Sequence, residues 1–410
     1  MGFLRDIFSP KQEPPRGAAI NKDSRHHSAI ALDLFMKGMF NEDIQNECLG
    51  HLDKAIELDF RNAEAWKIKG TILSVKSGLF SNKPVEEKFQ HQTLACYEKA
   101  LELDPEMGDG WQNKGELLKS MGRFEEALRC FDHGLSVSSP NPIHLHEQLI
   151  LSKVDALEKL NEDEKALSIL DQLLKTDISV MNKGTAFSDK GKILKKRGEQ
   201  EEAVRSYRSA VSAYINRKAY SQAIRVSNEI LEINPDDAEA LFAKGYSIMG
   251  SAGEEHSVQL LEEALPCFHR AVELRPAEFN YVFGEAECLK RMGRWYDAIE
   301  ACDRAIALDP KQEPAWSLKG FVLSRLMRGD EALECLKIAS SLNPGSSWAW
   351  IQMGEIYGTR GDLNEALDMF NMAIKANQSS QLAWMGKSGV LQRLGRTEEA
   401  EKIKMMLRGN

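Results

Sequence analysis

Cysteine pairs and long apolar runs are missing from this 410-residue sequence. Its seven cysteines form no CxxC motif, and their odd number and scattered positions are typical of buried thiols in a reducing compartment. No apolar stretch approaches the roughly 20 residues that a membrane-spanning helix needs, and no secretory signal with a cleavage site is recognisable. These absences predict a cytoplasmic protein.

Catalytic motifs are missing as well. The sequence contains no P-loop, no GxGxxG, no HExxH and no nucleophile elbow. His144 and His146 could form part of a metal site, but no neighbouring Cys or His completes a set of ligands. We therefore expect no catalytic residue, no cofactor and no metal, and we predict that the protein is not an enzyme.

The balance of charge is acidic, with 53 Lys and Arg against 62 Asp and Glu and a net charge of −9. A protein that neutralises phosphates usually carries a basic stripe, because binding depends on many cationic contacts. The sequence offers one short basic patch, made of Lys192, Lys195, Lys196 and Arg197. We therefore expect no nucleic-acid partner, since an RNA-binding helical repeat would need a basic groove.

The feature that is present is a repeat of 34 residues, which runs without insertion or deletion through the last 132 residues. A large residue opens each unit, a small residue follows four positions later, and alanine follows at sixteen. The large residues are Val282, Trp316, Trp350 and Trp384. The small residues are Ala286, Gly320, Gly354 and Ser388, and the alanines are Ala298, Ala332, Ala366 and Ala400. Such self-similarity predicts an array of stacked units.

Each unit has the periodicity of two helices. In one unit, Trp316, Gly320 and Leu323 lie three to four residues apart and share one helical face. Pro344 ends the second helix because proline lacks an amide hydrogen. Small residues such as Gly320 and Ala332 let the two helices approach closely. One such hairpin cannot bury its own apolar face, so the units must stack.

These positions resemble the tetratricopeptide repeat, or TPR. In the unit that begins at Ser347, the matching residues are Trp350, Gly354, Tyr357, Ala366, Phe370 and Ala373. The resemblance implies an all-α, right-handed α-solenoid of stacked helix-turn-helix units. It also implies a non-catalytic protein–protein interaction scaffold or adaptor.

The repeat pattern is less regular upstream, and it suggests several segments. "EEAVRSYRSAVSAYINRKAYSQAIRVSNEILEINP" breaks the phase: either one helix serves two units or an odd helix interrupts the array. A loose segment before it suggests a bend or boundary near 176–184. We expect a disordered tail at 1–25, N-terminal units at 26–180 with an insertion near 78–88, and C-terminal units at 181–410, with the phase break at 201–235, an insertion near 250–257 and regular register from 279.

The N-terminal segment "MGFLRDIF" would place Phe3, Leu4, Ile7 and Phe8 on one helical face. It is either a start-site tail or a short amphipathic anchor. The second reading gives an alternative function, a non-catalytic subunit of a membrane-associated or multiprotein assembly that docks through this segment. Membrane contact is expected only through residues 1–10. Asp6 stands where N-myristoylation requires Ser or Thr, which argues against that modification.

In TPR proteins the first helix of each unit, helix A, lines a concave groove at positions two before and one, five, and eight or nine after the large residue. These positions are polar in the N-terminal half and largely apolar, with arginine at one edge, in the C-terminal half. The groove candidates are Phe242, Tyr246, Phe283, Lys290, Arg291, Phe321, Arg325, Trp348, Ile351, Met385 and Arg393. We expect them to bind a peptide or helix with apolar anchors and some acidic character. The alternative is that the aromatic residues pack between neighbouring helices or against an extra helix of the same chain.

Chaperone-type TPR proteins grip a C-terminal carboxylate with Lys, Asn, Asn, Lys and Arg from three units. Lys67 and Asn113 match two of these positions, whereas Thr71, Gln148 and Ser152 replace the others. We therefore do not predict that this protein binds a chaperone tail.

Overall fold

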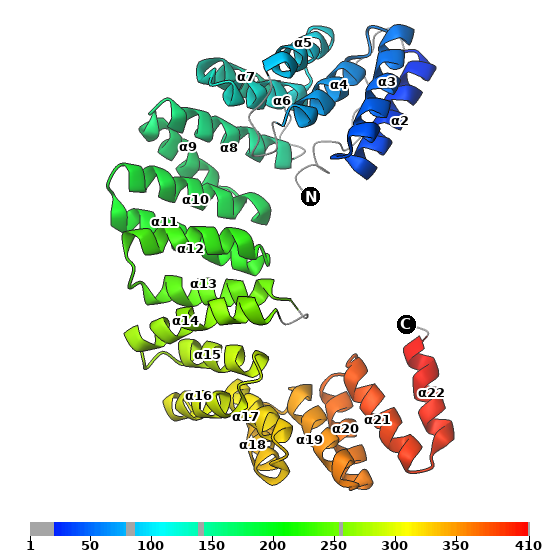
Figure 1. Ribbon diagram of the computed structural model, residues 1–410, viewed down its shortest axis with the longest axis vertical. Coiled ribbons are helices and arrows are strands. Elements are labelled where there is room, and N and C mark those ends of the chain that lie inside the picture. The colour runs from blue at the N-terminus through cyan, green and yellow to red at the C-terminus, as the bar shows by residue number, and fades with distance from the viewer. Residues whose placement is uncertain (1–19, 79–86, 138–142, 254–256, 409–410) are drawn as a thin grey trace. The chain divides into compact units, whose positions relative to one another are not determined.

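The computed structural model describes residues 20–78, 87–137, 143–253 and 257–408, and in these ranges it contains 21 helices and no strand (Figure 1). The predicted all-α repeat solenoid is confirmed. The chain divides into two compact units, residues 1–213 (unit 1) and 214–410 (unit 2). This division falls inside the segment where the repeat phase breaks, later than the boundary expected near 176–184.

Unit 1 is built from antiparallel helix pairs, in which we call the first helix A and the second B. Its A helices are α2 (Lys22–Gly38), α4 (Ala63–Lys76), α6 (Gly108–Ser120), α8 (Ile143–Lys159) and α10 (Val180–Lys196). Its B helices are α3 (Glu42–Leu58), α5 (Glu87–Leu103), α7 (Phe124–Val137), α9 (Asp163–Lys175) and α11 (Gln200–Asn216), the last of which crosses the boundary between the units.

Unit 2 repeats this alternation after one extra helix, α12 (Tyr220–Ile233). Its A helices are α13 (Ala238–Ser251), α15 (Phe279–Arg291), α17 (Glu313–Arg325), α19 (Ser347–Arg360) and α21 (Gln381–Arg393). Its B helices are α14 (Val258–Leu274), α16 (Trp295–Leu308), α18 (Gly329–Leu342), α20 (Leu363–Ala376) and α22 (Thr397–Arg408). Among the described helices α12 comes after α11 and before the α13–α14 pair, so the phase break coincides with one additional helix.

Close contact between the A and B helices explains why small residues recur in the sequence. A Cβ atom added to Gly115 would lie 2.3 Å from the Phe131 ring, and one added to Gly320 would lie 2.6 Å from Leu336. Both distances are far below van der Waals contact, so each position excludes any larger residue unless its neighbour moves. The 34-residue signature therefore marks the packing inside a hairpin.

The recurrent tryptophan fixes the turn between one unit and the next. The indole N–H of Trp111 donates a hydrogen bond to the carbonyl of Pro105, six residues earlier, at 2.8 Å. Trp316 makes the same bond to Pro310 at 2.9 Å, and Trp384 to Gln378 at 2.8 Å. The bond therefore forms even where the expected proline is replaced by Gln378, because a backbone carbonyl is the acceptor.

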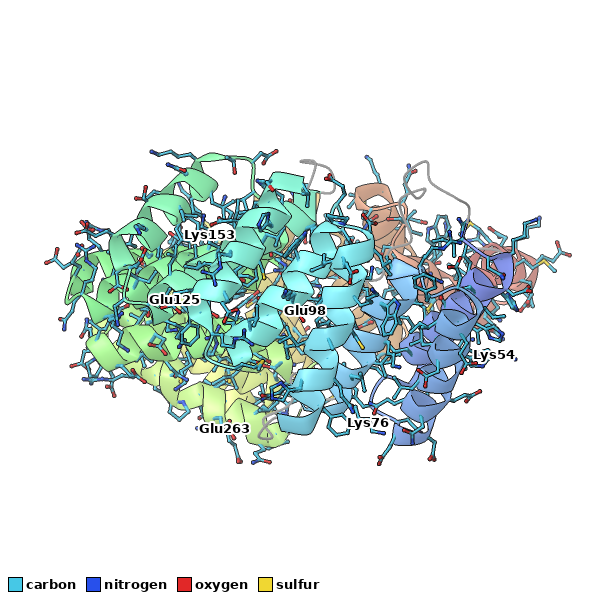
Figure 2. All side chains as sticks on the ribbon, turned by 90° about the horizontal axis from the view of Figure 1, so that it is seen from above. Lys54, Lys76, Glu98, Glu125, Lys153 and Glu263 are labelled. Carbon is cyan, nitrogen blue, oxygen red and sulfur yellow. The ribbon has the colours of Figure 1, made fainter. Side chains whose placement is uncertain are left out.

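In unit 1, ion pairs join the B helix of one hairpin to the A helix of the next. Lys114 of α6 reaches Glu98 of α5 at 3.2 Å, and Lys153 of α8 reaches Asp132 of α7 at 2.6 Å. Figure 2 labels Glu98 and Lys153 on this densely charged surface. These partly exposed pairs add little stability individually.

The structure differs from the prediction for the N-terminal tail at the start of the first described helix. Helix α2 begins at Lys22, so residues 22–25, expected in the tail, are helical. The Asn21 side chain accepts a hydrogen bond from the amide of Asp23, and the backbone N–H of Asn21 donates to Asp59, which explains this early start. The apolar segment Phe3–Phe8 lies outside the described residues, as do residues 79–86 of the first insertion and 254–256 of the second. Across the described ranges, no helix is both long and apolar enough to span a membrane.

Candidate functional site

Successive A helices contact each other in both units, from α2 to α4, α6 and α8 and from α13 to α15, α17, α19 and α21. Side chains on the faces of the A helices that turn away from the B helices therefore form a continuous strip in each unit. We call the one in unit 2 the aromatic strip, which comprises Phe242, Tyr246, Phe283, Phe321, Trp348 and Met385. We call the one in unit 1 the ionic strip, which comprises Lys67, Asp109, Lys119, Asp155, Glu158 and Lys192.

Three members of the aromatic strip are clearly exposed: Tyr246 at 39%, Trp348 at 41% and Met385 at 60% of their surface. Leu382, beside Met385 on α21, is also exposed. Side chains of this size normally gain free energy by leaving water. A series of them on neighbouring A helices is the kind of surface that binds a partner.

The other aromatic members serve both the core and the surface. The Phe242 ring stacks on Tyr281 with centroids 4.9 Å apart, and Phe283 stacks on Phe279 at 5.6 Å. Both are partly buried against the core clusters of unit 2. Packing between neighbouring helices, the alternative raised by the sequence, thus accounts for much of these two side chains. They form the floor of the strip rather than free anchors.

Phe321 lies at the centre of the strip. Its ring centroid is 6.0 Å from that of Trp348, and the Lys290 ammonium lies 5.9 Å from the same ring. Lys290 also forms an ion pair with Glu287 at 2.7 Å. This part of the strip therefore combines two aromatic rings with a cation whose charge is already compensated.

Ile351 does not belong to the surface. Its side chain is 3% exposed and packs in a core cluster with Phe370 and Val390. The groove position one residue after Trp350 points into the interface with the next unit, because α21 packs against α19 there. The assignment of Ile351 to the groove is therefore wrong.

Two of the three candidate arginines bind the protein backbone. Arg291 donates from Nη1 to the carbonyl of Met249 at 2.7 Å, and Arg393 donates from Nη1 to the carbonyl of Gly358 at 2.5 Å. These carbonyls lie in the last turn of the preceding A helix, where intrahelical donors run out. Arg325 differs: within the described ranges it is exposed and makes no hydrogen bond or ion pair.

Glu355 of α19 lies near Arg325 in the aromatic strip. Burial raises the pKa of its carboxyl above the ordinary value, although a hydrogen bond from Gln352 and the charge of Arg325 partly oppose the rise. The Gln352 amide donates to Glu355 at 3.2 Å. The environment of this carboxylate is therefore one that disfavours its charge.

The ionic strip of unit 1 is closed by bonds between units. Lys67 of α4 reaches Asp109 of α6 at 2.6 Å, and Lys119 of α6 reaches Asp155 of α8 at 2.8 Å. A third link joins Glu158 of α8 to Lys192 of α10 at 2.9 Å. Opposite charges at facing positions of successive units were visible in the sequence, and reading the units in pairs would have revealed this ladder.

Lys67 is the most deeply buried member of the ionic strip, with 7% of its side chain exposed. Burial alone would lower the pKa of its ammonium, but the carboxylates of Asp109 and Glu64 outweigh burial and hold the pKa above its usual value. Glu64 lies 2.9 Å from the same nitrogen. Lys67 is therefore charged, compensated by two acids, and withdrawn from any ligand.

The positions compared with the chaperone-type carboxylate site are engaged within unit 1. The Asn113 amide lies 3.4 Å from the Thr71 hydroxyl, and the Gln112 amide donates to Gln148 at 3.5 Å. The short basic patch is also engaged, since Lys196 pairs with Asp163 and Arg197 with Glu199. These contacts leave no basic groove in this region of unit 1.

The cysteines point to no reactive site in the described residues, and the side chain of His144, one of the two metal candidates, lies outside them. All seven thiols are buried, and burial raises their pKa, to about 12 for Cys302. A raised pKa keeps a thiol protonated and weakly nucleophilic. The described part of the chain contains no group of three or more His, Cys, Asp or Glu that could hold a metal ion.

Comparison with known protein families finds the tetratricopeptide repeat at residues 96–129, 259–313 and 351–404. The chain is a tetratricopeptide-repeat protein. Repeats of this kind are found in both units, and proteins built from them are in general non-catalytic scaffolds that bind other proteins. No curated protein matches this sequence.

Several solved structures are similar to parts of this TPR protein. MamA from Desulfovibrio magneticus RS-1 is 18% identical over 43% of this chain and 97% of its own, with a TM-score of 0.39. PilF from Pseudomonas aeruginosa is 15% identical over 51% and 92%, with a TM-score of 0.44. The Cut9–Hcn1 hetero-tetramer of the APC/C is 13% identical over 95% and 88%, with a TM-score of 0.41.

Proposed function

We propose that this TPR protein is a non-catalytic scaffold or adaptor that binds a peptide or an amphipathic helix of a partner protein along the aromatic strip of unit 2. The observation that carries the proposal is the exposure of Tyr246, Trp348 and Met385 on the A helices of one unit. Apolar side chains at such spacing suit the anchors of an extended peptide or of a helix laid into a groove.

The contrast with unit 1 supports the choice of surface. The ionic strip uses the equivalent positions for ion pairs among its own residues, so a ligand would have to break those pairs before it could bind. On the aromatic strip a ligand would cover apolar surface that is already in water. Binding there gains free energy from burial and loses few existing contacts.

The partner is expected to carry apolar anchors and some acidic character. The strip supplies the rings of Phe321 and Trp348 for the anchors, and the exposed Arg325 beside it for the acid. The alternative function, an assembly subunit docked through residues 1–10, depends on a segment outside the described residues, and no observation in the described part favours it.

The test is a triple substitution in the exposed part of the strip, Tyr246→Ser with Trp348→Ser and Met385→Ser. Full-length protein is used to select peptides from a random display library, and the best peptide is measured by fluorescence anisotropy. We expect the triple variant to lose at least about tenfold in affinity, because several anchors lose buried surface.

The matched control removes similar side chains from B helices, which lie on the other side of unit 2: Tyr296→Ser, Ile338→Ser and Met372→Ser. These residues are also exposed, so both variants lose apolar surface while the core stays intact. The control should bind as the parent does, and circular dichroism should show that both variants fold. If the triple variant of the aromatic strip folds and binds the peptide as tightly as the parent does, the proposal is refuted.

A further inference from the structure

One position near the end of helix A recurs in successive repeats of unit 2. The contacts of the residues at this position show which cation near the aromatic strip is available to a ligand. Residues 291, 325, 359 and 393 are separated by 34 residues and so occupy one position in four consecutive units. Three of them are arginines, and recurrence alone suggests a row of cations for an acidic partner. The contacts of the individual side chains contradict that simple reading.

Arg291 and Arg393 are structural residues. Each donates to a carbonyl in the last turn of the preceding A helix, Arg291 to Met249 and Arg393 to Gly358. Removing either guanidinium would leave a helix end without a donor that it now has. A ligand carboxylate would have to compete with these bonds, so the two arginines are poor ligand contacts.

Arg325 makes no such bond. The last carbonyls of α15 accept from the turn that follows: Met292 N–H donates to Cys288 and Gly293 N–H to Lys290, each at 3.0 Å. Gly293 makes this turn possible because its φ of +73° lies in the left-handed region. The guanidinium of Arg325 is exposed to solvent and has five donor hydrogens.

The surroundings of Arg325 favour a bound carboxylate. Phe321 lies one helical turn before Arg325 on α17, and its ring is near Trp348 on α19. Lys290, whose ammonium lies 5.9 Å from the Phe321 ring, is already paired with Glu287. The nearby Glu355 accepts from Gln352 and lies in surroundings that disfavour its charge. Arg325 is thus an exposed guanidinium near two aromatic rings, and within the described residues it forms no ion pair, although Glu355 is close enough for its pKa, which burial raises, to be lowered in part by the charge of Arg325.

We propose that Arg325 is a carboxylate-binding subsite, and that the ligand of the aromatic strip carries an internal Asp or Glu next to a large apolar residue that packs on Phe321 and Trp348. This inference rests on the proposed function. We favour an acidic side chain over a chain-terminal carboxylate because the strip continues on both sides of Arg325, toward Phe283 and toward Met385. A peptide that follows the strip therefore passes over Arg325 with its backbone uninterrupted.

The experiment is a selection from a random peptide library displayed between fixed linkers, so that no ligand has a free C-terminal carboxylate. Full-length parent, Arg325→Gln and Lys337→Gln are used in parallel. Lys337 is an exposed residue of the B helix α18, so its substitution removes the same charge away from the strip. The parent and Lys337→Gln should enrich an acid beside the apolar anchors, and Arg325→Gln should enrich the anchors without the acid.

The selected peptide and its Glu→Gln or Asp→Asn counterpart then complete a double-mutant cycle with Arg325→Gln. A charge-assisted contact predicts about tenfold or greater loss for each single change and little further loss for the double change. Apolar anchors without enriched acid, or fully additive losses, would overturn the subsite and leave the proposed function standing. Peptides that bind regardless of Trp348 and Met385 would overturn the proposed function and the subsite with it.

Discussion

In unit 1 the ionic strip is closed by ion pairs between successive A helices. In unit 2 the aromatic strip leaves aromatic side chains exposed to water, and the guanidinium of Arg325 near it is exposed as well. Both units use the same hairpin, with glycine or alanine where the helices cross and tryptophan at the turn. Lys67 and Phe283 occupy the same position relative to the large residue of their units. The repeat frame thus fixes the backbone and leaves the inner positions free to serve stability or binding.

This comparison separates residues that hold the solenoid from residues that are available to a partner. A repeat array is stabilised by contacts within each unit and with its neighbours. In unit 1 the inner positions contribute to the neighbour contacts through ion pairs. In unit 2 the neighbour contacts rely on packed side chains such as Ile351 and Phe242, and on Arg291 and Arg393, which bind the backbone of the preceding unit.

Replacing the recurrent tryptophan of a repeat by alanine should have the largest effect on stability, and the effect should be the same in both units. Trp111→Ala and Trp350→Ala each remove a partly buried indole and its bond to the preceding turn, at a cost of about 3–5 kcal/mol. Hydrogen exchange should rise first in the neighbouring helices of the altered unit. A uniform rise along the chain would contradict local stacking, and very different costs would contradict a shared frame.

Removing the two acids that compensate Lys67 should lower stability more than replacing Lys67 itself. With Glu64→Ala and Asp109→Ala together, a buried ammonium loses both counter-charges, at a cost of about 3 kcal/mol. Lys67→Met should cost less, because the two carboxylates it leaves are partly exposed and can be hydrated. Urea unfolding measures both variants. If the Met variant is the less stable one, Lys67 does not act as a compensated buried charge.

Adding a methyl group to the glycine where the helices cross should destabilise each unit by about 1–3 kcal/mol, through contact with Phe131 for Gly115→Ala and with Leu336 for Gly320→Ala. The matched controls are the helical glycines Gly50 and Gly389, which have open space around an added Cβ. There the change to Ala should stabilise by up to about 1 kcal/mol. Thermal unfolding distinguishes the two signs.

Much of the fold could be predicted from the sequence, because the frame residues repeat at a fixed spacing. The A and B helices of the regular region follow from that spacing, and the phase break at 201–235 contains the additional helix α12. The place where the chain divides into units could not be predicted, since α11 continues through it without a change of composition. The start of α2 was misplaced because its cap depends on Asn21 and Asp59, which are distant in sequence.

The candidate site was predicted less well, because a register position specifies where a side chain starts and not what it contacts. Ile351 shares its position with Phe283 and yet is buried by the following unit. Arg291 and Arg325 share another position, yet Arg291 donates to a backbone carbonyl of the preceding A helix and Arg325 is exposed. Such differences depend on the neighbouring unit, which the repeat pattern does not encode.

The smallest expected change in stability has opposite signs in the two units. Glu116 and Glu355 occupy the same position, five residues after Trp111 and Trp350. Glu116 pairs with Lys119 at 2.9 Å, so Glu116→Gln should destabilise unit 1 slightly, by about 0.2–1 kcal/mol. Burial raises the pKa of Glu355, so its ionised form costs stability and Glu355→Gln should stabilise unit 2 at neutral pH.

The pH dependence of the Glu355 effect follows from the same shift. A folded-state pKa above the unfolded value near 4.5 means that the native protein binds more protons between the two values. Stability therefore increases as the pH falls through that window, and the advantage of Glu355→Gln should shrink and vanish below it. Urea unfolding of parent and variant at neutral pH and at pH 4 or lower measures the change. An advantage that grows on acidification would show that Glu355 is stabilised as a carboxylate, and the inner faces of the two units would then differ less than their contacts indicate.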